Sequence, residues 1–123
     1  MSVPVSLDRL RAEVDAFGPS AYALTTGADG RPHAVLAAVA WSGDRLALPA
    51  GERTAANAGE RPHVALLWPP AEAGGYSLIV DGDAEVDGGH LLVVPTKAVL
   101  HRPAALGAEP THAGCGSDCL PLV

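Results

Sequence analysis

Aromatic and basic side chains are scarce in this sequence. The 123 residues include two Trp, two Tyr and one Phe, and 8 Lys plus Arg stand against 14 Asp plus Glu, for a formal net charge of −6. A protein that binds a nucleic-acid backbone needs a concentrated basic surface, because its affinity comes from displacing counterions. We therefore expect no nucleic-acid partner. With so few aromatic residues, the core must consist mainly of Ala, Val and Leu.

Long hydrophobic segments are lacking as well. The longest uncharged apolar run, 34–41, is much shorter than the ~20 residues that a membrane-spanning helix requires. Asp8, Arg9 and Glu13 stand where a signal peptide would need a continuous apolar stretch. The sequence therefore predicts a cytoplasmic protein with no membrane partner. Its abundance of Ala, Gly, Pro and Arg is typical of a GC-rich bacterial genome.

The two cysteines lie close together near the C-terminus, which excludes a disulfide framework across the fold. Cys115 and Cys119 stand near His112, and these three residues are candidate ligands for a metal ion. A redox-active thiol pair is an alternative interpretation. A Cys-x-x-x-Cys spacing in a Gly-rich segment seldom preorganises ligands, so a tail with incidental thiols is the simpler interpretation.

Apolar periodicity divides the first hundred residues into one helix and a series of strands. Ser6 is a suitable N-cap for an amphipathic helix, which Gly18 and Pro19 end. The segment 51–60 predicts a short exposed helix that Gly59 closes. Strands separated by turn residues are expected at 21–26, 33–41, 45–50, 63–68, 76–86 and 90–102.

The expected fold is mainly β: a six-stranded antiparallel split β-barrel with an N-terminal helix and a short helix between strands three and four. A single domain, 1–102, fits a chain of this length, and 103–123 is expected to be a C-terminal tail that contains Pro, Gly and both cysteines. Side chains fill the interior of a small barrel, so a ligand should lie on its outside or at a subunit interface.

The tripeptide Arg-Pro-His occurs twice, at 31–33 and 61–63, each time before an apolar run. The paired histidines could converge on a metal ion, or the paired arginines on an anion. However, two histidines are fewer than the three or four ligands of a zinc site, and Pro commonly begins a strand. We interpret both copies mainly as strand starts.

Four acidic residues alternate along one expected strand: Asp81, Asp83, Glu85 and Asp87. An EF-hand loop would need Gly at its sixth position and Glu at its twelfth, and neither occurs here. Period-two alternation instead places the four carboxylates on one solvated face of a strand. The motifs of a nucleophilic serine, a phosphate-binding P-loop and a Rossmann dinucleotide site do not occur in the sequence.

The segment 51–60 carries a more specific hypothesis. The free N–H groups at the start of a helix, beside a guanidinium and a hydroxyl, form a phosphate receptor. Arg53 would supply the forked charged donor and Thr54 the hydroxyl. An exposed helix without a ligand is the alternative.

The stretch "ALTTGADGRPHAVLAAVAWSGDRLALPAGERTAANAGERPHVALLW" resembles the pyridoxamine 5′-phosphate oxidase-like, FMN-binding split β-barrel superfamily, in particular its small actinobacterial members. The similarity lies in a strand, a "DGRPH" turn, two further strands, a phosphate-binding helix of the form G-S-R-T/K-x-x-N-L and a P-x-V-x-L strand. It spans about 21–86, and "PTKAVLHRP" is similar to the last barrel strand of small members.

The resemblance implies a homodimer with FMN, or a related deazaflavin, at the subunit interface. It implies that the cofactor phosphate contacts Arg53 and Thr54, that the ring lies along strand backbone, and that Trp68 flanks the ring. No residue is assigned a catalytic role, because the cofactor would carry out hydride or electron transfer. The residues implied to bind the cofactor are His33, Ala34, Val35, Leu48, Pro49, Ala50, Arg53, Thr54, Asn57 and Trp68.

The chain departs from the family pattern at several positions. Glu52 stands where many members have Ser, Thr54 stands where others have Lys, and a substrate-binding C-terminal portion is not recognisable. Oxidation of vitamin B6 is therefore not expected. Three functions remain open: a flavin- or deazaflavin-binding oxidoreductase with an unknown small-molecule substrate, a split-barrel binding or regulatory module that has lost flavin binding, and a metal or thiol function of the C-terminal cysteine pair.

Overall fold

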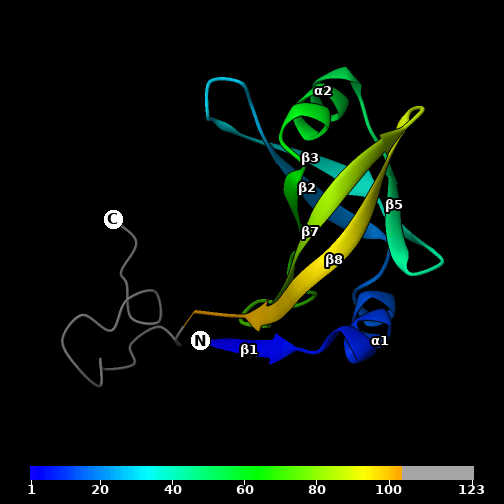
Figure 1. Cartoon of the computed structure of the whole chain (residues 1–123). Helices are drawn as coiled ribbons and strands as arrows, with labels where there is room; N and C mark the ends of the chain where they lie inside the picture. Colours follow the sequence, from blue (N-terminus) through cyan, green and yellow to red (C-terminus); the bar gives the residue numbers. More distant parts are fainter. Residues whose placement is uncertain (104–123) are drawn as a thin grey trace.

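Figure 1 shows the computed structural model of the chain, in which residues 1–103 are described. The helices are α1, Leu7–Phe17, and α2, Glu52–Glu60. Neither has the length and apolar character that crossing a membrane requires. The strands are β1 Ser2–Val5, β2 Ser20–Thr26, β3 Pro32–Ala38, β4 Ala40–Ser42, β5 Arg45–Pro49, β6 His63–Trp68, β7 Ser77–Asp87 and β8 His90–His101.

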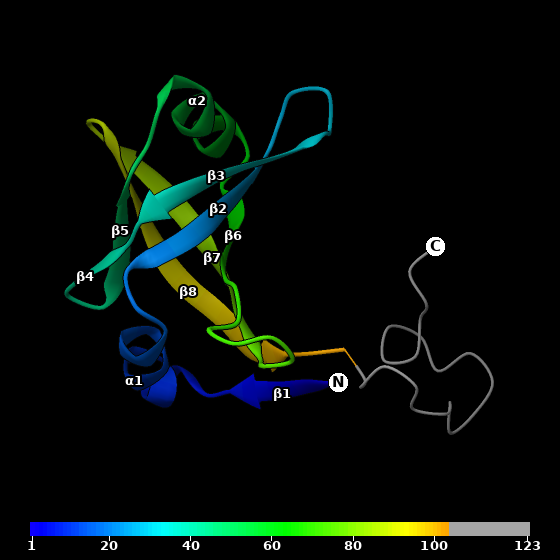
Figure 2. The ribbon, with the colours of Figure 1, turned by 180° about the vertical axis from the view of Figure 1, so that it is seen from behind.

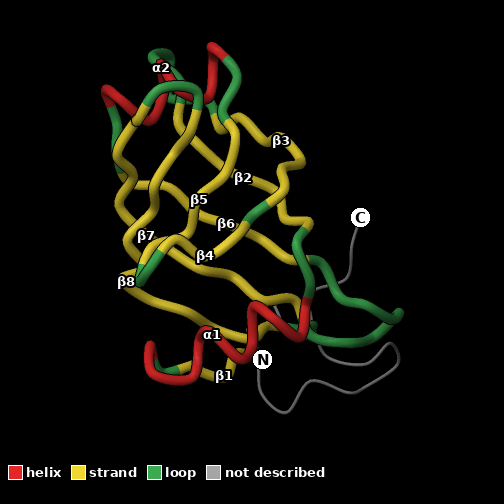
Figure 3. Tube along the Cα trace, turned by 90° about the vertical axis from the view of Figure 1, so that its right-hand side faces the viewer, coloured by secondary structure: helices red, strands yellow, loops and turns green. Residues whose placement is uncertain are grey.

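The strands form one antiparallel sheet that curls into a half-barrel (Figure 3). The hydrogen-bonded order is β3-β2-β6-β7-β8-β5-β4, and β1 pairs with β8 beside this path. β3 and β4 lie at opposite ends of the order, yet only Val39 separates them in sequence. Chain connectivity therefore brings the two edges of the sheet together at Val39, whose N–H donates to the Pro19 carbonyl at 2.7 Å. From there β3 and β5 diverge towards α2 (Figure 2).

The split-barrel class is confirmed, but the predicted count of six strands is wrong. The hydrogen-bonded path contains seven strands, and β1 adds to the side of β8. The single strand expected at 33–41 is two strands, because the chain turns at Val39 and β4 pairs with β5 instead of β2. β1 is too short to show an alternation in the sequence, and it pairs only because the N-terminal segment lies along the end of β8.

The core lies on the inner face of the curled sheet. On β2, Ala21, Ala23 and Thr25 are buried, whereas the residues between them point to the outer face. The other inward-facing strand residues are mainly Ala, Val and Leu, as the composition predicts. The largest fully buried side chain is that of Trp68, whose indole N–H donates to the carbonyl of Gly18 at 2.9 Å. This bond ties β6 to the end of α1.

α1 forms where the sequence predicts a helix. Leu10 and Val14 are buried, whereas Leu7 in the first turn is exposed. Ser6 occupies the N-cap position with extended backbone, but its side chain makes no capping hydrogen bond. Gly18 ends the helix at a φ of 98°, a conformation that side chains disfavour.

α2 differs from the expected helix in two respects. It continues through Gly59 instead of closing there. It is also not simply exposed, because Thr54, Asn57 and Ala58 are buried. Neither Thr nor Asn marks a buried position by hydrophobicity, so the sequence pattern concealed this inner face.

Candidate functional site

A groove of about 600 Å³ lies between β3, the end of β5 and the first turn of α2. One wall is formed by His33 and 35–38, and the other by 49–54. These segments come from opposite sides of the incomplete barrel wall, where β3 and β5 diverge (Figure 2). The groove therefore brings together residues that the sequence separates. Six residues of the implied cofactor-binding set line the groove: His33, Val35, Pro49, Ala50, Arg53 and Thr54.

Strand backbone is open along both walls of the groove. β3 pairs with β2 along one edge, and no strand of residues 1–103 pairs with the other edge at this end. β4 pairs with β5 only as far as Ala47. Beyond that point Leu48 and Pro49 pair with β8 along one edge, and β4 does not cover their other edge. Unpaired N–H and C=O groups are obligatory hydrogen-bonding groups that a polar ligand can satisfy. The N–H of Ala50 is already committed, since it donates to the Gly89 carbonyl at 2.8 Å.

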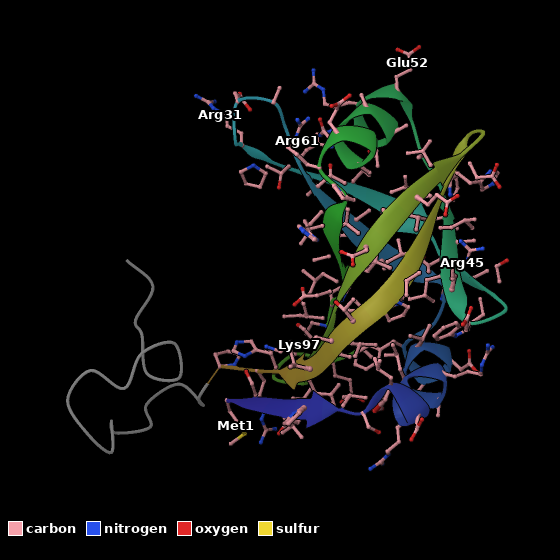
Figure 4. All side chains as sticks on the ribbon, in the orientation of Figure 1. Met1, Arg31, Arg45, Glu52, Arg61 and Lys97 are labelled. Carbon is pink, nitrogen blue, oxygen red and sulfur yellow. The ribbon has the colours of Figure 1, made fainter. Side chains whose placement is uncertain are left out.

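The start of α2 supplies positive potential at one end of the groove. The N-cap is Gly51, so no side chain there bonds the first N–H groups of the helix. Arg53 is exposed, and within the described part of the chain its guanidinium forms no ion pair. Thr54 is 2% exposed but borders the groove. Glu52, which projects from the start of α2 in Figure 4, also lines the groove and places a negative charge beside Arg53.

A buried polar contact lies beneath this region. Asn57 Nδ2 donates to Thr25 Oγ1 at 3.1 Å and joins α2 to β2. His33 faces Thr25 across the β2–β3 pair, and its buried Nδ1 has no hydrogen-bond partner among the residues that the structure describes. The polar groups of this cluster are therefore incompletely paired, and an unpaired buried polar atom costs about 1–3 kcal/mol. A second hollow of about 570 Å³ adjoins this cluster and is lined by His33, Asn57, Arg53 and Arg31.

Four residues of the implied cofactor-binding set do not line the groove: Ala34, Leu48, Asn57 and Trp68. Of these, Asn57 lines the adjoining hollow. Ala34 is exposed on the outer face of β3. The side chain of Leu48 is buried, which leaves its backbone as the part available to a ligand. The expectation that Trp68 flanks a ring does not hold, because its side chain is fully buried and its N–H is bonded to Gly18.

The two Arg-Pro-His copies stand at the starts of β3 and β6, on either side of β2. The first copy borders the groove through His33. In the second copy, His63 Nδ1 lies 2.7 Å from Oδ1 of Asp83 on β7, and Arg61 Nε donates to the Thr26 carbonyl at 2.7 Å. Both copies are therefore strand starts, as interpreted, with different surroundings.

The four alternating carboxylates point to the exposed side of β7, which confirms the solvated-face interpretation. Asp83 is paired with His63, and Glu85 lies 3.4 Å from Arg45. Among residues 1–103, no group of three or more His, Cys, Asp or Glu side chains could hold a metal ion. The candidate ligands His112, Cys115 and Cys119 lie outside the described residues.

Sequence reasoning missed the apolar part of the groove. Leu36, Ala37 and Ala38 line it on β3, and Gly51 lies across from them. Leu36 is 62% exposed although it is a large apolar residue in the middle of a strand. The alternation along β3 predicts which residues share a face, but not that this strand lies at the edge of the sheet.

Comparison of the sequence with known proteins identifies two relatives of similar length. No family model matches it. Uncharacterized protein Mb0449c of Mycobacterium bovis and uncharacterized protein MT0457 of Mycobacterium tuberculosis are each 36% identical to it, over 94% of this chain and 93% of their own length. This identity over nearly the whole chain establishes common descent.

Solved structures share the fold at lower identity. An F420 reductase superposes with a TM-score of 0.56 and 17% identity over 65% of this chain and 88% of that chain. A candidate pyridoxamine 5′-phosphate oxidase from Listeria innocua superposes with a TM-score of 0.61 and 17% identity, over 76% of this chain and 96% of that chain. A FAD-binding protein from Mesorhizobium loti superposes with a TM-score of 0.56 and 15% identity, over 81% of this chain and 90% of that chain. The chain thus belongs to one family with the two mycobacterial proteins, and it shares its fold with these split-barrel structures.

Proposed function

We propose that this protein binds a flavin or deazaflavin in the groove between β3, β5 and α2, and that it acts as an oxidoreductase on a small molecule. The observation that carries this proposal is the composition of the groove. At one end lie a helix start and Arg53, which forms no ion pair in the described part of the chain, and open strand backbone lies along both walls. The neighbours described as an F420 reductase and a FAD-binding protein share the fold and support a flavin-type cofactor.

The anionic end of the cofactor would lie at the start of α2. Arg53 would donate a forked pair of hydrogen bonds, Thr54 would offer its hydroxyl at the groove margin, and the first N–H groups of the helix would add further donors. The open N–H and C=O groups of β3 and β5 would orient the polar edge of the ring. Val35 would exclude water from it. When bound, the ring supplies the hydride or electron transfer, while the protein fixes its position.

Fluorescence titration with FMN, FAD and F420 tests the proposal, with quenching of the cofactor emission as the signal. We expect binding of at least one of the three. Arg53→Ala should weaken the affinity about tenfold or more, since a hydrogen bond to a charged group contributes about 1.5–3 kcal/mol. Arg9→Ala is the matched control, because Arg9 is an exposed arginine on α1 that does not line the groove. Absence of binding, or an Arg53→Ala protein that binds as the control does, would refute the proposal.

Glu52 favours a second candidate function, a split-barrel binding or regulatory module that does not bind flavin. Its carboxylate lines the groove in the first turn of α2, where it would repel a phosphate. A correctly folded protein that binds none of the three cofactors would support this candidate. A metal or thiol function of Cys115 and Cys119 concerns residues outside the described range.

We further propose that the active form is a homodimer with the cofactor between two copies. The groove is open on the side of β3, so one copy alone leaves a ring there in contact with water. Such exposure would allow side reactions that flavin sites must exclude.

A further inference from the structure

One edge of β8 is left without a partner strand over a short stretch. β7 pairs with the opposite edge of β8 along its length. On the edge in question, the pairing with β5 ends at Val93 and the pairing with β1 begins at Ala98. No strand of residues 1–103 pairs with this edge from 94 to 97. Pro95, which has no N–H to donate, stands in this gap, where a ladder hydrogen bond is not required.

A pocket of about 440 Å³ borders this gap. It lies between the first two turns of α1, the β4–β5 hairpin and β8, at the end of the half-barrel opposite α2 (Figure 1). It shares no lining residue with the groove or with the hollow beside α2. Small-molecule sites commonly have volumes of ~300–1,000 Å³, so the pocket is large enough for a small ligand. We call it the α1 pocket.

The walls of the α1 pocket are mostly apolar, although the pocket is open to solvent. Leu7 on α1 is 51% exposed and Val94 on β8 is 48% exposed. The Trp41 ring, Leu10 and Pro95 complete the apolar lining. An apolar body seated here would remove both exposed side chains from water, which is favourable in proportion to the area that it covers.

The pocket carries more negative than positive charge. Asp8 and Asp44 line it, both are exposed, and neither forms an ion pair within residues 1–103. Arg11 is the only basic side chain among the described residues that line the pocket. Its guanidinium is already engaged, since it donates to the Gly43 carbonyl and lies 4.5 Å from the centroid of the Trp41 ring. Two carboxylates therefore remain for a positive group of a ligand.

We propose that the α1 pocket binds a small amphipathic cation, with an apolar body about the size of a phenyl ring and an ammonium group. The apolar body would contact Leu7, Val94 and Trp41, and the ammonium group would lie near Asp8 and Asp44. An anion of the same shape would meet the two carboxylates and be repelled. The net charge of −6 also attracts a cation to the protein. The site does not depend on a flavin and so goes beyond the proposed function.

Calorimetric titration of the flavin-free protein with three probes of similar shape tests the charge preference. The probes are phenethylamine, phenethyl alcohol and phenylacetate, which are cationic, neutral and anionic. We expect the amine to bind about fivefold or more tightly than the alcohol at low salt, and phenylacetate to bind most weakly. The double variant Asp8→Asn, Asp44→Asn should lose this preference but keep its affinity for the alcohol. The matched control is Asp15→Asn, Asp87→Asn, which changes the net charge equally at two exposed positions outside the pocket.

The apolar walls are tested by two further variants. Leu7→Ser and Val94→Thr should each weaken the amine and the alcohol alike, about two- to fivefold, because each removes apolar contact area. Both side chains are about half exposed, so these variants should fold. Leu36→Ser is the control, since Leu36 is another exposed leucine and does not line the α1 pocket.

Each result decides one part of the proposal. Equal affinity for the three probes, or an amine preference that persists in the Asp8→Asn, Asp44→Asn protein, would overturn the cation preference. An equal loss of that preference in the control pair would show attraction by net charge and not by this pocket. If the double variant loses its native circular dichroism, Asp44→Asn alone decides, because Asp44 lies in an exposed turn.

The position of the site is decided separately. The absence of saturable binding by any probe, or unchanged affinities of the Leu7→Ser and Val94→Thr proteins, would overturn the pocket itself. A flavin titration of the same proteins keeps this inference distinct from the proposed function. A protein that binds the amine but no flavin refutes the proposed function and supports the α1 pocket.

Discussion

Asn57 of α2 donates a hydrogen bond from Nδ2 to Oγ1 of Thr25 on β2, at 3.1 Å and across 32 residues of sequence. Both residues are buried, at 6% and 3% exposure. The bond holds α2 against the inner face of β2, beside the diverging edges of the half-barrel. It thereby fixes the position of Arg53 and Thr54 relative to β3, which forms the opposite wall of the groove.

Asn57→Ala should lower the free energy of unfolding by about 1–3 kcal/mol, because it leaves the Thr25 hydroxyl buried without its donor. Thr25→Val removes the same bond with little change of shape. In the double variant the loss of unfolding free energy should be smaller than the sum of the two single losses, because both substitutions break the same hydrogen bond. Urea unfolding followed by circular dichroism measures all four proteins, and additive losses would show that the two side chains are not coupled.

The two tryptophans should respond differently to replacement by Phe. Trp68→Phe should cost about 2–4 kcal/mol, because it removes the bond to Gly18 and leaves a cavity in the core. Trp41→Phe is the matched change, since the indole N–H of Trp41 has no hydrogen-bond partner within residues 1–103. The ring of Trp41 lies 4.5 Å from the Arg11 guanidinium. We expect a cost of about 1 kcal/mol or less there. Equal losses in urea unfolding would contradict the role assigned to the Trp68 bond.

Two glycines provide a second matched pair. At the bulge in the β7–β8 pairing, a Cβ on Gly82 would lie 2.5 Å from Val93 Cγ1 and 2.7 Å from the Val94 carbonyl oxygen. Gly82→Ala should therefore destabilise the protein by about 1–3 kcal/mol or more. Gly59→Ala in α2 meets its nearest neighbour, Val86, at 3.8 Å and should stabilise it by about 0.5–1 kcal/mol. Thermal unfolding compares the two variants. A Gly82→Ala protein as stable as the wild type would mean that β7 and β8 pack less closely at this bulge than the structure shows.

Glu52→Gln should tighten flavin binding about two- to fivefold at low salt, because it removes a carboxylate from the groove beside Arg53. The gain should shrink as ionic strength rises. Glu60→Gln, at the opposite end of α2, is the control and should change affinity little. The titration described for Arg53→Ala measures both variants. Unchanged or weaker binding by Glu52→Gln would mean that the cofactor phosphate does not approach the first turn of α2.

Local patterns predicted most elements correctly. The stripe of α1 and the alternation along β2, β6 and β7 each depend on neighbours within a few residues, so they are visible in one sequence. The break at Val39 and the pairing of β1 were missed, because both depend on which strands meet in space. The buried face of α2 was missed for the same reason, since Asn57 is inside only because Thr25 accepts its hydrogen bond.

The sequence by itself determined the β-rich class, the small-residue core and the segment 51–60 as a helix with a charged start. These follow from composition and from periods of two and 3.6 residues, which are properties of the local chain. Only the tertiary structure decided that His33 and Arg53 border one groove and that Trp68 belongs to the core. These relations depend on strand order and register, which arise from pairing between segments far apart in the chain.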